Sequence, residues 1–177
     1  REKIFKPRAR KILDIAEEHG KHVEKIADIG AGSGLMLDEF RKIHPTSKLL
    51  AIEPSGILAD ACRKKDIPVE EDLIENIKNQ ENSCDLVTCF EVLEHVYDPH
   101  LFIKNISNLL KPGGIMIVTT LSVDGFDIQF LWEKSEQISP PHHINFLSTK
   151  GFKHLFKRAG LNNIHVITPG VLDVDIV

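Results

Sequence analysis

Two glutamates and a histidine lie close together at Glu91, Glu94 and His95, directly after an apolar run. On a helical turn, positions i, i+3 and i+4 share one face, so these three side chains are expected to converge. Carboxylate and imidazole groups can hold a divalent ion, and a histidine can also remove a proton near neutral pH. His142 and His143 follow two prolines in a later loop and are candidates to reach the same place. Both interpretations, a metal site and a proton acceptor, stay open.

A glycine-rich turn is the second chemical feature of the chain. Gly30, Gly32 and Gly34 alternate directly after the apolar residues 26–29, and a helical pattern follows. Because glycine lacks a Cβ, the backbone can turn tightly and a ligand can lie against it. The N–H groups at the start of the next helix would point at that ligand. The pattern predicts a nucleotide-type cofactor pocket after a first parallel strand, and the alternative is a turn that binds nothing.

A carboxylate ends the next apolar run. Glu53 follows residues 49–52 and lies about twenty residues beyond Gly30, the spacing of a ribose-binding acid in dinucleotide folds. Such a side chain can accept hydrogen bonds from both ribose hydroxyls. The alternative is a solvated glutamate at a strand end, which is less expected directly after a glycine turn.

The elements that must position these residues alternate along the chain. Apolar runs predict strands at 25–30, 48–53, 67–69, 84–90, 115–120 and 164–168. Helical spacing predicts helices at 8–19, 34–43, 55–65, 73–78, 98–110 and 148–160. This alternation predicts an α/β fold, with a doubly wound, mostly parallel sheet of six or seven strands and helices on both faces.

The glycine spacing distinguishes two classes of cofactor. The dinucleotide fingerprint is G-x-G-x-x-G, whereas this chain has G-x-G-x-G shortly after Asp28. That pattern resembles motif I of the Rossmann-like (class I) S-adenosylmethionine-dependent methyltransferases. Residues 85–96 and 109–118 resemble the fourth-strand and fifth-strand motifs of the same family. The resemblance covers about residues 23–168 and implies that S-adenosylmethionine is the cofactor.

The resemblance also implies which residues bind the cofactor. They are Asp28, Gly30, Ala31, Gly32, Gly34, Glu53, Pro54, Asp72 and Phe90. The glycine turn would hold the methionine part, with Asp28 behind it, and Glu53 would bind the ribose. Pro54 would lie near the adenine. Asp72 would meet the adenine amino group, unless it is only one carboxylate of a solvated acidic loop, and Phe90 would flank the sulfonium.

The Glu-x-x-Glu-His segment resembles ubiquinone-pathway O-methyltransferases, and with a distant histidine it also resembles small-RNA 2′-O-methyltransferases. The second resemblance implies a divalent metal such as Mg, held by Glu91, Glu94, His95 and His142. In relatives without a metal the histidine of this segment serves packing, a helix hydrogen bond or proton transfer. His95, Glu91 and His143 are therefore the candidates to activate the methyl acceptor without a metal. A metal would lower the pKa of the attacking hydroxyl, whereas a histidine would remove its proton.

Bulk properties limit the classes of partner. The chain has 177 residues and a formal net charge of −4 without a basic stripe, so nucleic acid is not expected. No apolar run approaches membrane-spanning length. The three cysteines form no C-x-x-C pair, which suits a reducing, cytoplasmic compartment. The basic residues among the first eleven positions are expected to be the solvated start of a helix.

The chain is expected to form a single domain over residues 1–177, with a helical lead at 1–22 and a substrate-side lid at 121–147. Residues 171–177 alternate like a strand that stops abruptly, which suggests a piece of a longer protein. The expected activity is O-methylation of a small hydroxylated metabolite or sugar. The alternatives are an NAD-dependent oxidoreductase and a non-catalytic cofactor-binding module.

Overall fold

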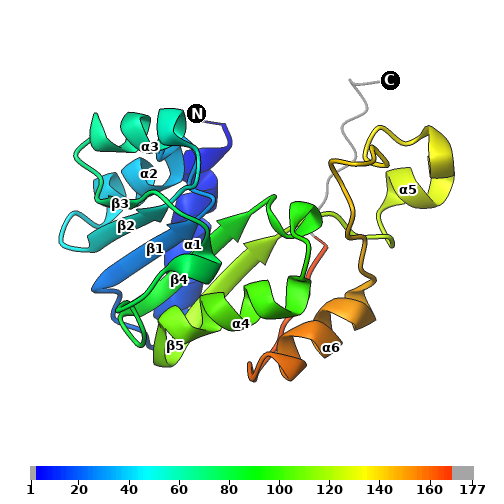
Figure 1. Cartoon of the computed structure of the whole chain (residues 1–177). Coiled ribbons are helices and arrows are strands. Elements are labelled where there is room, and N and C mark those ends of the chain that lie inside the picture. The colour runs from blue at the N-terminus through cyan, green and yellow to red at the C-terminus, as the bar shows by residue number, and fades with distance from the viewer. Residues whose placement is uncertain (1–2, 169–177) are drawn as a thin grey trace.

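A parallel sheet forms the centre of the computed structural model, which describes residues 3–168 (Figure 1). Its five strands follow the order β3-β2-β1-β4-β5, and every neighbouring pair is parallel. The strands are β1 (Lys25–Ile29), β2 (Lys48–Ile52), β3 (Val69–Glu70), β4 (Cys84–Phe90) and β5 (Leu110–Thr119). The predicted α/β fold with a doubly wound parallel sheet is therefore confirmed.

Helices cover both faces of this sheet. The helices are α1 (Phe5–Glu18), α2 (Leu35–Ile43), α3 (Gly56–Arg63), α4 (Pro99–Leu109), α5 (Phe126–Leu131) and α6 (Thr149–Arg158). Three 3₁₀ turns accompany them, η1 (Ile74–Asn76), η2 (Leu93–His95) and η3 (Trp132–Lys134). Helices α1, α2 and α3 lie on one face, and α4 and α6 lie on the other (Figure 1).

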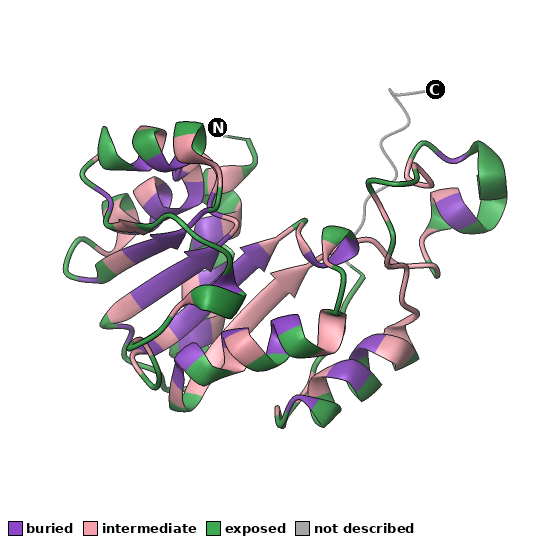
Figure 2. Cartoon of the chain, in the orientation of Figure 1, coloured by how far each residue is buried: buried purple, intermediate pink, exposed green. Residues whose placement is uncertain are grey.

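An apolar core lies between the sheet and each of the two helical layers. Side chains along the central strands point alternately to the two faces, so each strand contributes to both cores. In β4, Leu86 packs with α1 and α2, whereas Val87 packs with α4 and α6. Figure 2 shows the buried residues concentrated along β1, β2 and β4. A strand buried on both faces must be apolar almost throughout, which explains the near-continuous apolar run of β4.

Local capping signals begin the two helices that cover the second face. The Asp98 side chain accepts a hydrogen bond from Leu101 N at 2.9 Å, and Pro99 occupies the first turn of α4. Ser148 caps α6 in the same way by accepting from Gly151 N at 3.1 Å. Both caps satisfy backbone N–H groups that the helix itself leaves unpaired, so these boundaries follow from the sequence.

The predicted strand count is too high for the part of the chain that the structure describes, which contains five. Residues 164–168 form no strand, although Val166 packs against the core on the α4 and α6 face. The strand predicted at 171–177 lies outside the described residues. The helix predicted at 73–78 is only the single turn η1, and β5 begins at Leu110, earlier than predicted.

Residues 121–147 form a separate feature beyond the carboxyl ends of β4 and β5 (Figure 1). This 121–147 segment contains α5 and η3, and most of its residues are exposed or half-buried (Figure 2). Within residues 3–168, no helix combines the length and the apolar character that crossing a bilayer requires.

Gly30, directly after β1, provides a test of the packing at the carboxyl edge of the sheet. Its φ is +67°, and a Cβ there would lie 2.5 Å from Val92 Cγ2, whereas Gly20 has a φ of +65° and open space around it. Gly20→Ala should therefore cost only the backbone strain, about 1 kcal/mol. Gly30→Ala should lose about 1–3 kcal/mol more in the free energy of unfolding, measured by urea denaturation. Equal losses would contradict the contact.

Candidate functional site

The glycine turn joins β1 to α2 at the carboxyl edge of the sheet, where ligands of open α/β folds bind. Gly30 N–H donates to Ile52 O at 2.8 Å, and Gly32 N–H donates to Glu53 Oε2 at 2.7 Å. Gly32 has a φ of +55°, and a Cβ built there would meet nothing within 4 Å. Packing therefore does not require a glycine at this position, and its open side is where a ligand can approach the backbone.

Glu53 holds this turn in place. Its side chain is buried, with Oε2 accepting from Gly32 N–H and Oε1 accepting from Ser55 N–H at 2.9 Å. A carboxylate has about four acceptor sites, so two remain for other donors. Glu53 can thus organise the turn and still accept hydrogen bonds from a pair of ligand hydroxyls. Pro54, the next residue, is exposed at the same edge.

Asp28 lies behind the turn and is almost fully buried. Thr88 Oγ1, on the neighbouring strand β4, donates to Asp28 Oδ1 at 2.6 Å. The pKa of Asp28 is raised to about 7 as the net result of three effects: burial raises it most, the Thr88 hydrogen bond lowers it, and the nearby charge of Glu53 raises it. A carboxyl group that titrates near neutral pH beneath the turn is suited to face a cationic ligand.

Phe90 ends β4 and is half-buried. The Arg8 guanidinium, from α1, lies 5.2 Å from the centre of the Phe90 ring, within the range of a cation–π contact. The basic start of the chain is predicted as a solvated helix, so Arg8 is a residue that sequence reasoning missed. Its spacing of four from the buried Ile12 is the one available signal, because it places Arg8 on the packed face of the helix.

Asp72 follows β3 and is exposed. Its Oδ1 accepts hydrogen bonds from Asn76 Nδ2 and Leu73 N–H, each at 2.7 Å. These two hydrogen bonds lower the pKa of Asp72, and the Asn76 bond has the larger effect. The structure thus gives Asp72 a local role at η1, and its contact with an adenine stays a prediction.

A second group of polar side chains gathers after β4. Glu94, His95 and His143 place ligand atoms within 4.8 Å of one another, and Glu94 is buried. Glu91 and His142 are not part of this group. Glu91 has a φ of +53°, outside the turn that begins at Leu93, and its Oε1 accepts from Thr119 Oγ1 at 2.6 Å. The expected single helical face therefore does not form.

His142 contributes its backbone rather than its ring. The His142 carbonyl oxygen lies 2.8 Å from His95 Nδ1, and the Gln137 carbonyl oxygen lies 2.7 Å from His143 Nδ1. A carbonyl oxygen only accepts, so Nδ1 of each ring carries the proton. Nε2 of His95 and of His143 is therefore the basic nitrogen in the neutral state. The two ring centres lie 4.8 Å apart, and one nitrogen of each ring lies within 4.8 Å of a carboxylate oxygen of the buried Glu94.

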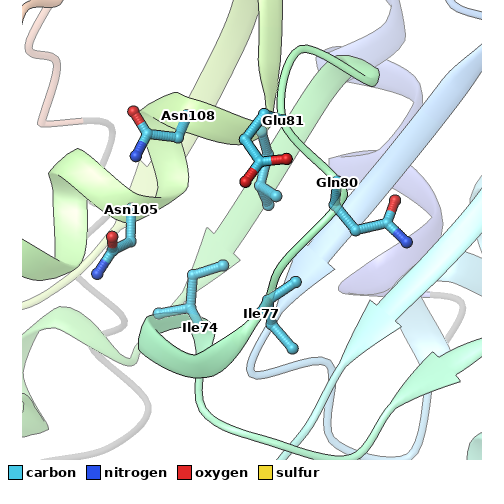
Figure 3. Close-up of a pocket in the computed structure, with 7 residues that line it drawn as sticks. Ile74, Ile77, Gln80, Glu81, Asn105 and Asn108 are labelled. Atoms are coloured by element: carbon cyan, nitrogen blue, oxygen red, sulfur yellow. The ribbon is translucent and has the colours of Figure 1, made fainter.

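One small cavity lies between η1 and α4, away from both groups (Figure 3). Its volume is about 30 Å³, and it is lined by Ile74, Ile77, Gln80, Glu81, Asn105, Asn108 and Leu109. That space holds about one water molecule, and its amide groups suit water. This cavity is too small for a cofactor and plays no part in the candidate site.

Residues 1–166 match the family described as a methyltransferase domain. The chain belongs to that family. The membership favours S-adenosylmethionine over NAD, as the glycine spacing predicts, and confirms the class I resemblance.

Curated relatives and solved structures agree with this membership. The chain is 32% identical over 115 positions to the ubiquinone biosynthesis O-methyltransferase of Citrobacter koseri. This match covers 58% of the chain and 44% of that protein. The enzyme of that name from Xanthomonas campestris is 29% identical over 103 positions, covering 55% of this chain and 43% of that protein. The chain thus spans less than half of the length of these relatives.

The fold matches a methyltransferase solved with the Haloferax volcanii Trm112 methyltransferase activator. The TM-score is 0.73 and the identity is 19%, and the match covers 98% of this chain and 83% of that one. At this identity the likeness establishes the shared fold.

Asp28→Asn tests the environment beneath the turn. Between about pH 4 and 7, folded Asp28 retains a proton that the unfolded chain has released, so its contribution to the free energy of unfolding falls as pH rises. Asparagine has no such proton. The variant should therefore gain stability relative to the natural chain across this interval, by roughly 2–4 kcal/mol above about pH 7.

Urea denaturation at about pH 4.5, 6 and 8 measures this difference. The comparison near pH 4.5 serves as the internal control, because both chains are then mostly uncharged at this position when folded. A difference between the two proteins that stays constant across all three conditions would contradict the burial of an ionisable Asp28.

Proposed function

We propose that this chain binds S-adenosylmethionine and supports transfer of its methyl group to an oxygen of a small hydroxylated acceptor, such as a metabolite or sugar. The observation that carries the proposal is the open backbone at Gly32, pinned to Glu53 in a methyltransferase-family chain. The names of the curated relatives, ubiquinone biosynthesis O-methyltransferases, support oxygen as the accepting atom.

The cofactor residues have distinct tasks in this proposal. The turn formed by Gly30, Ala31, Gly32 and Gly34 would receive the methionine part, with Asp28 beneath it to offset positive charge. The two free acceptor sites of Glu53 would bind the ribose hydroxyls. Pro54 and Asp72 would border the adenine. Phe90 would lie beside the sulfonium, where an aromatic face stabilises a cation.

On the acceptor side, Nε2 of His95 or His143 would take the proton of the attacking hydroxyl. Bound S-adenosylmethionine supplies an activated methyl group, so the protein needs to align the acceptor oxygen and remove its proton. The buried Glu94, whose Oε2 accepts from Thr120 Oγ1 at 2.7 Å, would stabilise the imidazolium that forms. Glu91, held by Thr119, would orient the acceptor at the rim of this group.

A divalent ion is the second candidate for this place, because Glu94, His95 and His143 offer three ligand atoms within 4.8 Å. The set differs from the predicted one, since His143 replaces His142 and Glu91 is not included. Two imidazoles and one carboxylate suit zinc or a similar transition metal better than Mg²⁺, which prefers oxygen ligands. The donors therefore do not fit Mg²⁺, and the proton-acceptor role is the one proposed.

Transfer of tritiated methyl groups from S-adenosylmethionine to a panel of catechols and sugars tests the proposal. Label should reach at least one acceptor, and the rate should persist in EDTA. Whichever of His95→Ala and His143→Ala removes the proton acceptor should lower kcat by about 100-fold, the usual scale of a general base, and the other substitution should cost less. His154→Ala, at an exposed position on α6, is the matched control and should leave the rate unchanged.

Two results would contradict parts of this account. Loss of transfer in EDTA, with recovery on adding Zn²⁺ or Mn²⁺, would replace the proton acceptor with a metal. Binding of the cofactor without transfer to any acceptor would support the non-catalytic binding module.

A further inference from the structure

The side chain of Asn145 links the 121–147 segment to η2 by hydrogen bonds. Its Nδ2 donates to Leu93 O at 3.2 Å and also to Val96 O. The backbone N–H groups of Asn145 and Ile144 donate to Glu94 O, at 3.1 and 2.8 Å. Three carbonyl oxygens around this turn, those of Leu93, Glu94 and Val96, are thus engaged by two neighbouring residues of a distant segment.

The chemistry of an amide explains why asparagine stands there. A short 3₁₀ turn leaves its last carbonyl oxygens without partners in the turn. An amide nitrogen has two hydrogens, so one Asn145 side chain can satisfy two carbonyl oxygens at once. Aspartate has nearly the same shape but offers only acceptors, and it would face those oxygens without a hydrogen to share.

The same docking determines how the two histidines are arranged. Asn145 follows His142 and His143 by two or three residues, so fastening Asn145 to η2 brings the His142 carbonyl oxygen to His95 Nδ1. It also places the His143 ring beside the His95 ring. No hydrogen bond links Asn145 directly to either imidazole within the described residues. Its influence on them therefore passes through the backbone of residues 142–145.

We infer that Asn145 is a positioning residue that keeps Nε2 of His95 as the basic nitrogen facing the acceptor side, by docking residues 142–145 onto η2. The importance of that nitrogen for methyl transfer rests on the proposed function. The positioning itself can be tested without cofactor or acceptor, because the tautomer of His95 reports directly on the docking.

Long-range ¹H–¹⁵N spectra of the uniformly labelled protein distinguish the two neutral tautomers of each histidine. The His95 signals are assigned by their loss in His95→Ala. The natural chain should show His95 with its proton on Nδ1. Asn145→Asp removes both donated hydrogen bonds without changing the size of the side chain, and Asn145→Ala removes them without adding charge. Asn162→Asp, at an exposed position, is the matched control.

Both Asn145 variants should shift His95 to a mixture of tautomers, and the control should match the natural chain. Their affinity for S-adenosylhomocysteine should stay within about twofold, because Asn145 contacts no residue of the glycine turn. An unchanged Nδ1–H tautomer in the folded variants would overturn the inference. Unfolding of both variants would also overturn it, since Asn145 would then be a structural residue. Absence of S-adenosylhomocysteine binding by the natural chain would refute the proposed function alone.

Discussion

The hydrogen bond from Gly32 N–H to Glu53 Oε2, 2.7 Å long, ties the turn after β1 to the end of β2. It holds the glycine turn in place, and the side of Gly32 on which a Cβ would stand is open. The second oxygen of Glu53 holds Ser55 N–H at the start of α3. One buried carboxylate therefore connects two strand ends and a helix start, and the cofactor side of the site depends on that connection.

The turn also connects to the histidine pair through η2. Gly30 leaves no room for a Cβ against Val92, which directly precedes η2, and η2 in turn carries Glu94 and His95. The carboxyl edge of the sheet thus combines the glycine turn with a pair of imidazoles. Asp28, Glu53 and Glu94 are all buried at this edge, and buried acids are costly unless partnered. Each of the three carboxyl groups accepts a hydrogen bond from a neighbouring residue. Buried ionisable groups of this kind cluster at functional sites.

Features with short-range causes could be predicted from the sequence. The glycine turn, Glu53 after β2 and the caps Asp98 and Ser148 all lie where local patterns place them. Features that depend on distant contacts could not. Nothing in the histidine pair shows that His142 would present its carbonyl oxygen and His143 its ring, because the path of the loop decides this. The left-handed backbone of Glu91 similarly removes it from the expected helical face.

The most direct test of the cofactor pocket is calorimetric titration of S-adenosylhomocysteine into the natural chain and two alanine variants. Gly20 and Gly32 have similar positive φ values and open surroundings, so alanine should strain the backbone equally at both positions. The natural chain and Gly20→Ala should bind alike, Gly32→Ala should bind at least about tenfold more weakly, and NAD should give no binding heat. Equal affinity of the two variants, or no binding at millimolar S-adenosylhomocysteine, would contradict the account.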